Sequence, residues 1–147
     1  MASSVPSAVS ALLSIATAAL PTTAQVWFGK PLPTYTAPTT LQVYGVHDGT
    51  QEVAVLGPDF KREERYEIQC LLTSWAGDQD FAGRMNEVYA DFELITLAIG
   101  NNPTLNNTVR FAEIHTFDYI PDADAKGMSL GSLSFSVACQ ARISSLT

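Results

Sequence analysis

The sequence predicts a single α+β domain in which a mixed or antiparallel β-sheet of about five strands packs against two α-helices. Three observations predict this class. The chain has 147 residues, an ordinary size for one domain. Apolar residues recur at helical spacing near the N-terminus and again in residues 80–100. Elsewhere they alternate at strand spacing, so we expect one domain over residues 1–147.

The first helix is expected near the N-terminus. Ser3, Ser4 or Ser7 could cap its start, Pro6 suits its first turn, and Pro21 ends it. Its apolar positions follow the i, i+3, i+4, i+7 spacing and are Val5, Val9, Leu12, Leu13, Ala16 and Leu20.

Two strands and a long loop are expected next. Residues 24–28 form a short strand, and three prolines within residues 30–40 indicate an extended connector, because proline disrupts a sheet interior. Residues 41–47 alternate as a second strand. Asp48-Gly49 then begins a long irregular segment that ends near Asp59. A loop of this size in a compact domain is usually functional or mobile.

The clearest signal is a strand joined by a short break to one long helix. The strand, residues 65–75, places Tyr66, Ile68, Cys70 and Leu72 on one face. Asp78 or Asp80 suits the N-cap of the helix in residues 80–100. Residues 100–103, Gly-Asn-Asn-Pro, indicate its end. The apolar stripe expected to face the sheet is Phe81, Met85, Val88, Phe92, Ile95 and Ile99.

Two more strands complete the predicted sheet. Residues 107–119 form one, with a bulge between Phe111 and Ile114 where the alternation changes phase. Residues 121–127 form an acidic turn. Residues 132–143 then alternate strictly between apolar side chains and small polar ones.

The two cysteines, Cys70 and Cys139, lie in apolar strand patterns. They are expected to be buried thiols that pack as small hydrophobic groups. A disulfide would be possible if their strands were neighbours. No metal-ligand spacing surrounds them.

Composition and motifs argue against several functions. The net charge is −7, and the basic pair Lys61-Arg62 is followed directly by Glu63-Glu64, so a nucleic-acid-gripping surface is not expected. The chain lacks Gly-x-Ser-x-Gly and a phosphate-binding glycine loop. The histidines, His47 and His115, lie in predicted strands without a partner at ligand spacing. We therefore expect no enzyme, no catalytic residues, no cofactor and no metal.

The N-terminal apolar run also bears on location. Residues 8–20 are too few to span a membrane. No Lys or Arg occurs before Lys30, so the positive region of a secretory signal is missing. Charged residues make up only 16% of the chain. This suits a protein that buries much of its surface against other subunits, and also a monomer whose surface is rich in Ser and Thr.

The order of the predicted elements resembles that of tail terminator proteins of long-tailed (siphovirus-type) bacteriophages, in particular phages that infect actinobacteria. The match is closest at residues 62–70, Arg-Glu-Glu-Arg-Tyr-Glu-Ile-Gln-Cys, and at residues 74–78, Ser-Trp-Ala-Gly-Asp. The ending at residues 135–143 and the opening helix at residues 9–13 are also similar. Residues 31–56 match no signature of that family.

The resemblance implies a structural virion protein and no enzymatic activity. Copies would form a ring, a homohexamer, that caps the tail tube, ends its polymerisation and joins it to the head–tail connector. Implied partners are other copies of the chain, the tail tube protein and the connector or neck protein, with DNA only passing through the lumen and no membrane. The location would be the head-proximal end of the tail, after assembly in the host cytoplasm.

Contacts with the tube or connector are expected in the 48–59 loop and its flank and in the acidic 121–127 turn. The candidate interface residues are Asp48, Gln51, Glu52, Asp59, Lys61, Arg62, Asp122 and Asp124. Two alternatives remain at this point: another neck or tail component, such as a tail-tube subunit, and a secreted non-enzymatic binding domain.

Overall fold

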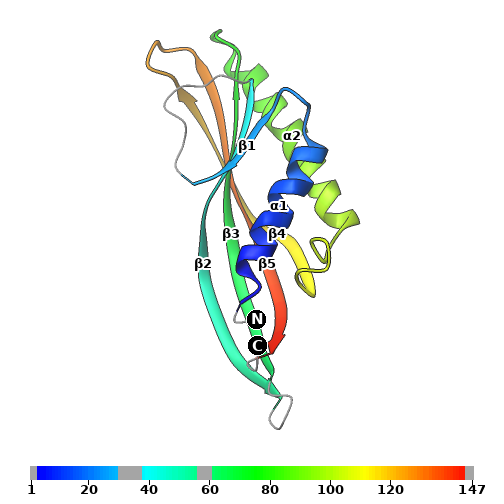
Figure 1. Cartoon of the computed structure of the whole chain (residues 1–147). Coiled ribbons are helices and arrows are strands. Elements are labelled where there is room, and N and C mark those ends of the chain that lie inside the picture. Colours follow the sequence, from blue (N-terminus) through cyan, green and yellow to red (C-terminus); the bar gives the residue numbers. More distant parts are fainter. Residues whose placement is uncertain (1–2, 30–37, 56–60, 145–147) are drawn as a thin grey trace.

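A computed structural model describes residues 3–29, 38–55 and 61–144. The elements in chain order are α1 (Val5–Ala19), β1 (Gln25–Phe28), β2 (Thr39–Val55), β3 (Lys61–Trp75), α2 (Phe81–Asn101), β4 (Phe111–Ala123) and β5 (Ser129–Ser144). The strands form one five-stranded sheet in the order β1-β2-β3-β5-β4. Both helices lie on one face of this sheet (Figure 1). The predicted α+β class is confirmed.

The directions of the strands are fixed by their pairing. β1 runs parallel to β2, whereas the β2–β3, β3–β5 and β4–β5 pairs are antiparallel. It follows that the two outer strands of the sheet, β1 and β4, run in opposite directions.

β2 is much longer than predicted. It pairs with β3 along its whole length, as far as Val55 opposite Lys61. Asp48 has a φ of 55° at a bulge between His47 and Thr50, so Asp48-Gly49 bends the strand rather than ending it. The predicted irregular loop is therefore wrong for residues 48–55. The remainder of that loop, with Asp59, lies outside the described residues, as do residues 30–37 of the predicted connector.

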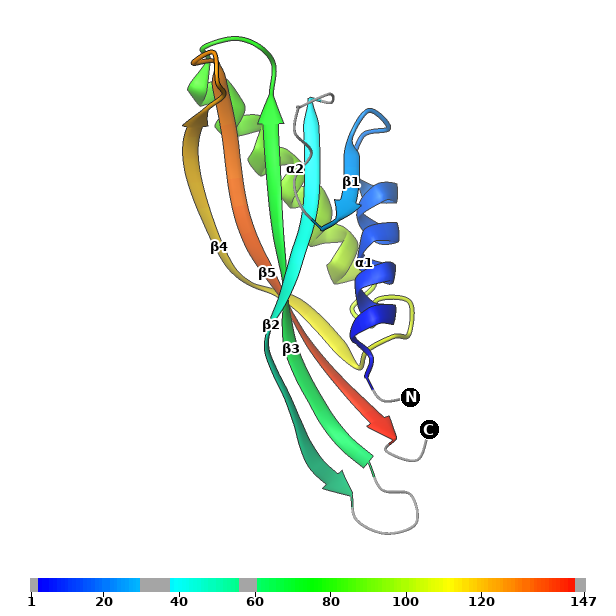
Figure 2. The ribbon, with the colours of Figure 1, turned by 60° about the vertical axis from the view of Figure 1, so that its left-hand side comes forward.

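The sheet continues beyond the helix layer at one end. Figures 1 and 2 show the last part of β2, the start of β3 and the end of β5 extending past both helices. In this three-stranded extension, which we call the arm, residues 61–64 of β3 pair with β5 on one side and with β2 on the other.

α1 occupies the predicted position, but the side chain of its N-cap residue does not bond the first turn of the helix. Ser4 is the N-cap residue and makes no side-chain capping bond within the helix. The hydroxyl of Ser3 instead accepts a hydrogen bond from Val5 N at 3.1 Å. The side chain of Ser4 points to β3.

α2 begins at the predicted cap. The carboxylate of Asp80 accepts a hydrogen bond from Gly83 N at 2.9 Å, which satisfies one of the free N–H groups of the first turn. A Cβ atom at Gly83 would collide with that carboxylate. Glycine at residue 83 is therefore part of the cap. At the other end the helix runs to Asn101, one residue past the predicted Gly100.

The face that α2 buries is only partly the predicted stripe. Val88, Ile95 and Ile99 are buried, but Phe81 and Met85 are about 40% exposed, so the prediction was wrong for these two. Two charged side chains that the prediction left out, Arg84 and Asp91, are buried on α2 instead. Both charged groups have polar partners. Such pairing lowers the cost of burial, and an apolar pattern cannot predict it.

The partners of Arg84 lie on α2 and just before it, where Asp78 is 3.8 Å away, whereas the partner of Asp91 lies at the start of β2. Arg84 donates to Glu87 from Nη1 at 2.9 Å. Asp91 accepts a hydrogen bond from Thr39 Oγ1 at 3.1 Å. The first contact is local to the helix, whereas the second joins α2 to a strand 52 residues earlier in the chain.

The last two strands follow the predicted order with shifted bounds. β4 starts at Phe111 instead of residue 107 and extends to Ala123, and its bulge lies between Ile114 and Phe117 rather than before Ile114. The alternation of β5 is confirmed. From residue 133 on, its buried apolar side chains are Leu133, Phe135, Val137, Cys139, Ala141 and Ile143, and Leu130 near the start of the strand is also buried.

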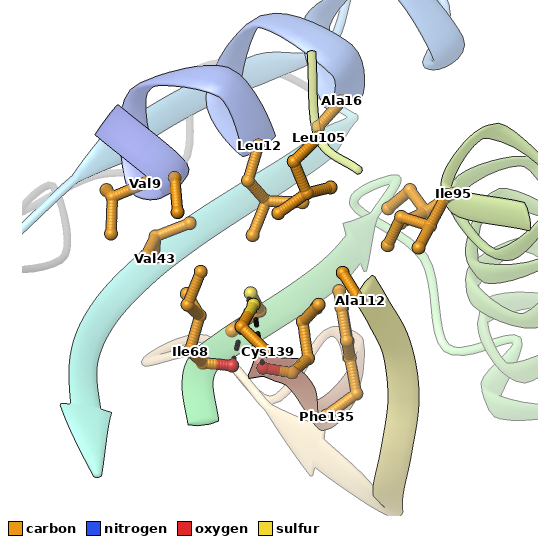
Figure 3. Close-up of a cluster of buried hydrophobic side chains, with 14 of the residues drawn as sticks. Val9, Leu12, Ala16, Val43, Ile68, Ile95, Leu105, Ala112, Phe135 and Cys139 are labelled. Atoms are coloured by element: carbon orange, nitrogen blue, oxygen red, sulfur yellow. Dashed lines mark hydrogen bonds between the residues drawn. The ribbon is translucent and has the colours of Figure 1, made fainter. Parts of the chain in front are cut away.

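The helices and the sheet enclose one apolar core. Figure 3 shows Val9 and Leu12 of α1, Ile95 of α2 and Phe135 of β5 pointing into it. Cys70 and Cys139 are buried and carry free thiols, as predicted from the apolar strand patterns around them. None of the described helices is long and apolar enough to cross a membrane.

Candidate interaction surfaces

The predicted interface residues separate into two groups at opposite ends of the sheet. One group lies in or beside the arm and comprises Asp48, Gln51, Glu52, Lys61 and Arg62. The other lies where β4 leads into β5 and comprises Asp122 and Asp124. The strand register places them far apart, because Lys61 is opposite Ser144 whereas Asp122 is opposite Leu130. The structure therefore gives the molecule two polar ends.

In the arm, polar side chains are linked across neighbouring strands. Gln51 donates from Nε2 to Glu64 at 2.7 Å and accepts from Arg62 Nη1 at 3.3 Å. Glu52 is exposed and stands opposite Glu63 in the β2–β3 register. Like charges opposite each other are unfavourable in a sheet.

Two further polar positions flank these links. Asp48 is exposed at the bulge of β2. Lys61 is exposed at the start of β3.

At the opposite end, Asp124 is a structural residue. It accepts hydrogen bonds from Trp75 Nε1 at 2.8 Å and from the backbone N–H groups of Lys126 and Met128 at 2.8 and 3.0 Å. The bond from Trp75 is the main reason that the pKa of Asp124 lies below its usual range. The predicted acidic turn is also shorter than expected, because residues 121–123 belong to β4. Asp122 remains exposed.

The helices leave the other face of the sheet uncovered, and we call it the helix-free face. Alternate residues of β5 lie on it, and in the middle of the strand they are small: Ser132, Ser134, Ser136 and Ala138. Across it, Glu67 of β3 bonds His115 of β4, with 2.5 Å between Oε1 and Nδ1. This bond raises the pKa of His115 and lowers that of Glu67.

Ser136 completes this polar cluster. Its hydroxyl donates to Glu67 at 3.1 Å and lies 2.8 Å from the hydroxyl of Thr116. The serine thus contacts the carboxylate instead of the imidazole, so the contacts orient side chains and do not build a nucleophile–base pair. His47 lies in β2 as predicted.

An apolar surface that the sequence did not predict lies where α2 meets β4. Phe81, Met85 and Tyr89 are spaced four residues apart, so they form one row on the helix, and Phe117 of β4 lies beside it. These four side chains, which we call the aromatic ridge, are 36–53% exposed. The ring centroid of Phe117 lies 6.4 Å from that of Tyr89 and 5.5 Å from that of Phe92.

One signal in the sequence could have indicated this surface. Besides the predicted stripe, α2 carries Tyr89, Leu94 and Leu97. Together they make an apolar arc wider than a helix lying on a sheet needs. Such an excess indicates that some apolar side chains remain exposed.

A second apolar surface lies at the opposite edge of the sheet. It is a hollow of about 460 Å³ between α1 and the first two strands. Val5, Val9 and Leu13 line it from α1, Phe28 from β1 and Val46 from β2. We call it the α1 hollow. Phe28 is 58% exposed at its margin.

Within the described residues, no three acidic, histidine or cysteine side chains lie close enough together to hold a metal ion. Comparison of the sequence with protein-family models and with curated proteins found no match.

Proposed function

We propose that the chain is a structural protein of a bacteriophage tail, similar to tail terminators, whose copies close into a homohexameric ring at the head-proximal end of the tail. The observation that carries the proposal is the geometry of the sheet. Its two outer strands run in opposite directions, and in the described residues no strand pairs with the outer side of either. If the ring axis runs along the strands, β4 of one copy lies antiparallel to β1 of the next. This arrangement lets the edge strands of two sheets associate.

The two polar ends support a ring that contacts different partners on its two sides. The arm would contact one of the two partner structures, the tail tube or the connector. The end with Asp122 would contact the other partner. In this proposal Gln51 and Arg62 present linked polar groups at the arm, while Asp124 shapes the opposite end through Trp75.

The charge of the chain supports passage of DNA through the lumen without tight binding. Six copies at −7 each carry −42. A surface of this sign repels the phosphate backbone. The helix-free face, with its small serine side chains, is the part of the sheet best suited to line such a lumen.

Mass measurement combined with negative-stain imaging of the purified full chain tests the proposal. We expect closed annular particles of one discrete mass, six times that of the chain. Open tubes would favour the alternative of a tail-tube subunit. A monomer at high concentration would contradict the ring and favour the alternative of a secreted binding domain. Antibody labelling of phage particles should mark the junction of tail and head.

A further inference from the structure

We propose that neighbouring copies meet head to tail, with the aromatic ridge of one copy seated in the α1 hollow of the next. The outer edge of β4 would then lie beside the edge formed by β1 and β2. This inference rests on the proposed ring and names the surfaces that would close it.

The two surfaces differ in shape and lie at opposite edges of the molecule. The ridge is formed by α2 and by β4, which is the last strand in the sheet order. The hollow is formed by α1 and by β1 and β2 at the other edge. Each surface includes side chains of a helix, and both helices lie on the same face of the sheet (Figure 2). The strand register places Phe28 and Phe117 at the same level, through Val43, Cys70 and Phe135. Two copies placed side by side in the same orientation would therefore bring Phe117 of the ridge to Phe28 at the margin of the hollow.

The strand directions agree with this placement. β4 of one copy would approach β1 and β2 of the next, and both of these run opposite to β4. β1 pairs with β2 only between Thr40 and Val43. In the described residues the rest of β2, as far as Val55, has no strand on that side. The outer edge of β4 could thus continue the sheet of the neighbour.

The occupant of the hollow is a second copy because the chain itself carries a matching apolar projection. A head-to-tail interface uses each surface once per copy, so it continues from copy to copy until the ring closes. Ridge-to-ridge contact would end at a dimer and leave every hollow empty. The proposed ring therefore requires the head-to-tail arrangement.

The ridge alone is too small to hold two copies together. A stable interface buries about 800 Å² per partner, and an aromatic side chain buries about 150–250 Å² when it passes fully out of solvent. The four ridge side chains are already partly covered, so the strand edges must supply the remaining area. Because binding energy concentrates in a few buried aromatic residues, one charged substitution on either surface should dissociate the copies.

Three single variants of the full chain test the proposal by native mass spectrometry at a concentration where the wild type is a ring. Phe117→Asp alters the ridge and Phe28→Asp alters the hollow. Leu97→Asp is the matched control, since Leu97 is 57% exposed on α2 and lies on neither surface. We expect the first two variants to lose the ring and the control to keep it.

Folding of each variant is checked by circular dichroism and by protection of the two buried thiols. Phe117 contacts Tyr89 and Phe92. If Phe117→Asp unfolds, Met85→Asp replaces it, because Met85 belongs to the ridge and is 40% exposed.

Mixing the two interface variants gives the decisive result. Phe117→Asp keeps its hollow and Phe28→Asp keeps its ridge, so a mixture should form one-to-one dimers that do not grow. Rings in both variants, or loss of the ring in only one of them, would overturn the head-to-tail interface and leave the proposed ring intact. A wild-type chain that stays monomeric would overturn both.

Discussion

Ser4 at the start of α1 donates both its backbone N–H and its hydroxyl to one carboxylate oxygen of Glu64 in β3, at 2.8 and 2.6 Å. Gln51 donates to the other oxygen at 2.7 Å, and the hydroxyl of Tyr66 lies 2.9 Å from that of Ser4. Glu64 is only 3% exposed. A buried carboxylate thus joins the first helix to the root of the arm.

Replacing Glu64 by Gln should destabilise the fold. The substitution keeps the shape of the side chain but removes the charge that strengthens the two bonds from Ser4. We expect the free energy of unfolding to fall by about 1.5–3 kcal/mol. Urea unfolding at one fixed protein concentration measures it, because self-association adds to apparent stability.

The matched control for this variant is Glu52→Gln, which removes an exposed carboxylate from the same arm. Its effect on the free energy of unfolding should stay within about 0.5 kcal/mol. Equal effects of the two substitutions would show that the carboxylate of Glu64 does not anchor α1.

The stabilisation by Glu64 should depend on pH in one direction. Burial raises its pKa, but the hydrogen bonds from Ser4 and Gln51 outweigh burial, so the pKa lies below its ordinary value of 4.5. An acid with a lowered pKa in the folded state stabilises that state above its unfolded pKa and loses the effect as the pH falls through the folded value.

The stability difference between wild type and Glu64→Gln should therefore be constant from neutral pH down to about 5. It should shrink below 4.5. Urea unfolding of both proteins across this range provides the comparison. A difference that grows on acidification would mean that Glu64 is protonated in the folded chain.

Two neighbouring substitutions on α2 test which face of the helix is buried. Ile95 is fully buried and Leu97 is 57% exposed. Ile95→Ala should lower the free energy of unfolding by about 2–5 kcal/mol, because it leaves a cavity in the core. Leu97→Ala should change it by less than about 0.5 kcal/mol. Thermal and urea unfolding measure both, and comparable losses would mean that the helix is rotated relative to the sheet.

Both thiols should resist modification in the folded protein. Burial raises the pKa of Cys139 to about 12 and raises that of Cys70 further, and thiol reagents react with the thiolate. At pH 8 we expect no labelling by iodoacetamide while the chain is folded and two labels per chain in denaturant. Intact mass measures the labels. A denatured chain that takes up none without reductant would instead contain a disulfide.

The strands whose buried face alternates strictly could be predicted from the sequence, because that information is local. The buried faces of β3 and β5 follow from Ile68, Leu72, Leu133 and Val137 and their neighbours. The course of β2 beyond His47 could not be predicted in this way. Asp48-Gly49 has the composition of a turn, and only pairing with β3 shows that these residues form a bulge.

The candidate surfaces, too, could be predicted from the sequence only in part. Gln51 lies within the predicted loop and Arg62 follows it, and pairing of β2 with β3 brings their side chains together. Their part in an interface stays a prediction. The sequence assigned Phe81 and Met85 to the core, since periodicity counts apolar residues without knowing the width of the sheet beneath them. Docking of α2 decided that they form an exposed ridge with Phe117.

By itself the sequence determined the two helices, the succession of helices and strands along the chain, and the acidic character of the chain. All of these depend on residues close together in the chain or on composition. The tertiary structure alone decided which charged groups are buried and which apolar groups are exposed. Asp91 is buried because Thr39, 52 residues away, supplies its hydrogen bond. The opposite directions of the two outer strands likewise result from pairing between distant segments of the chain. A local sequence pattern does not predict such pairing.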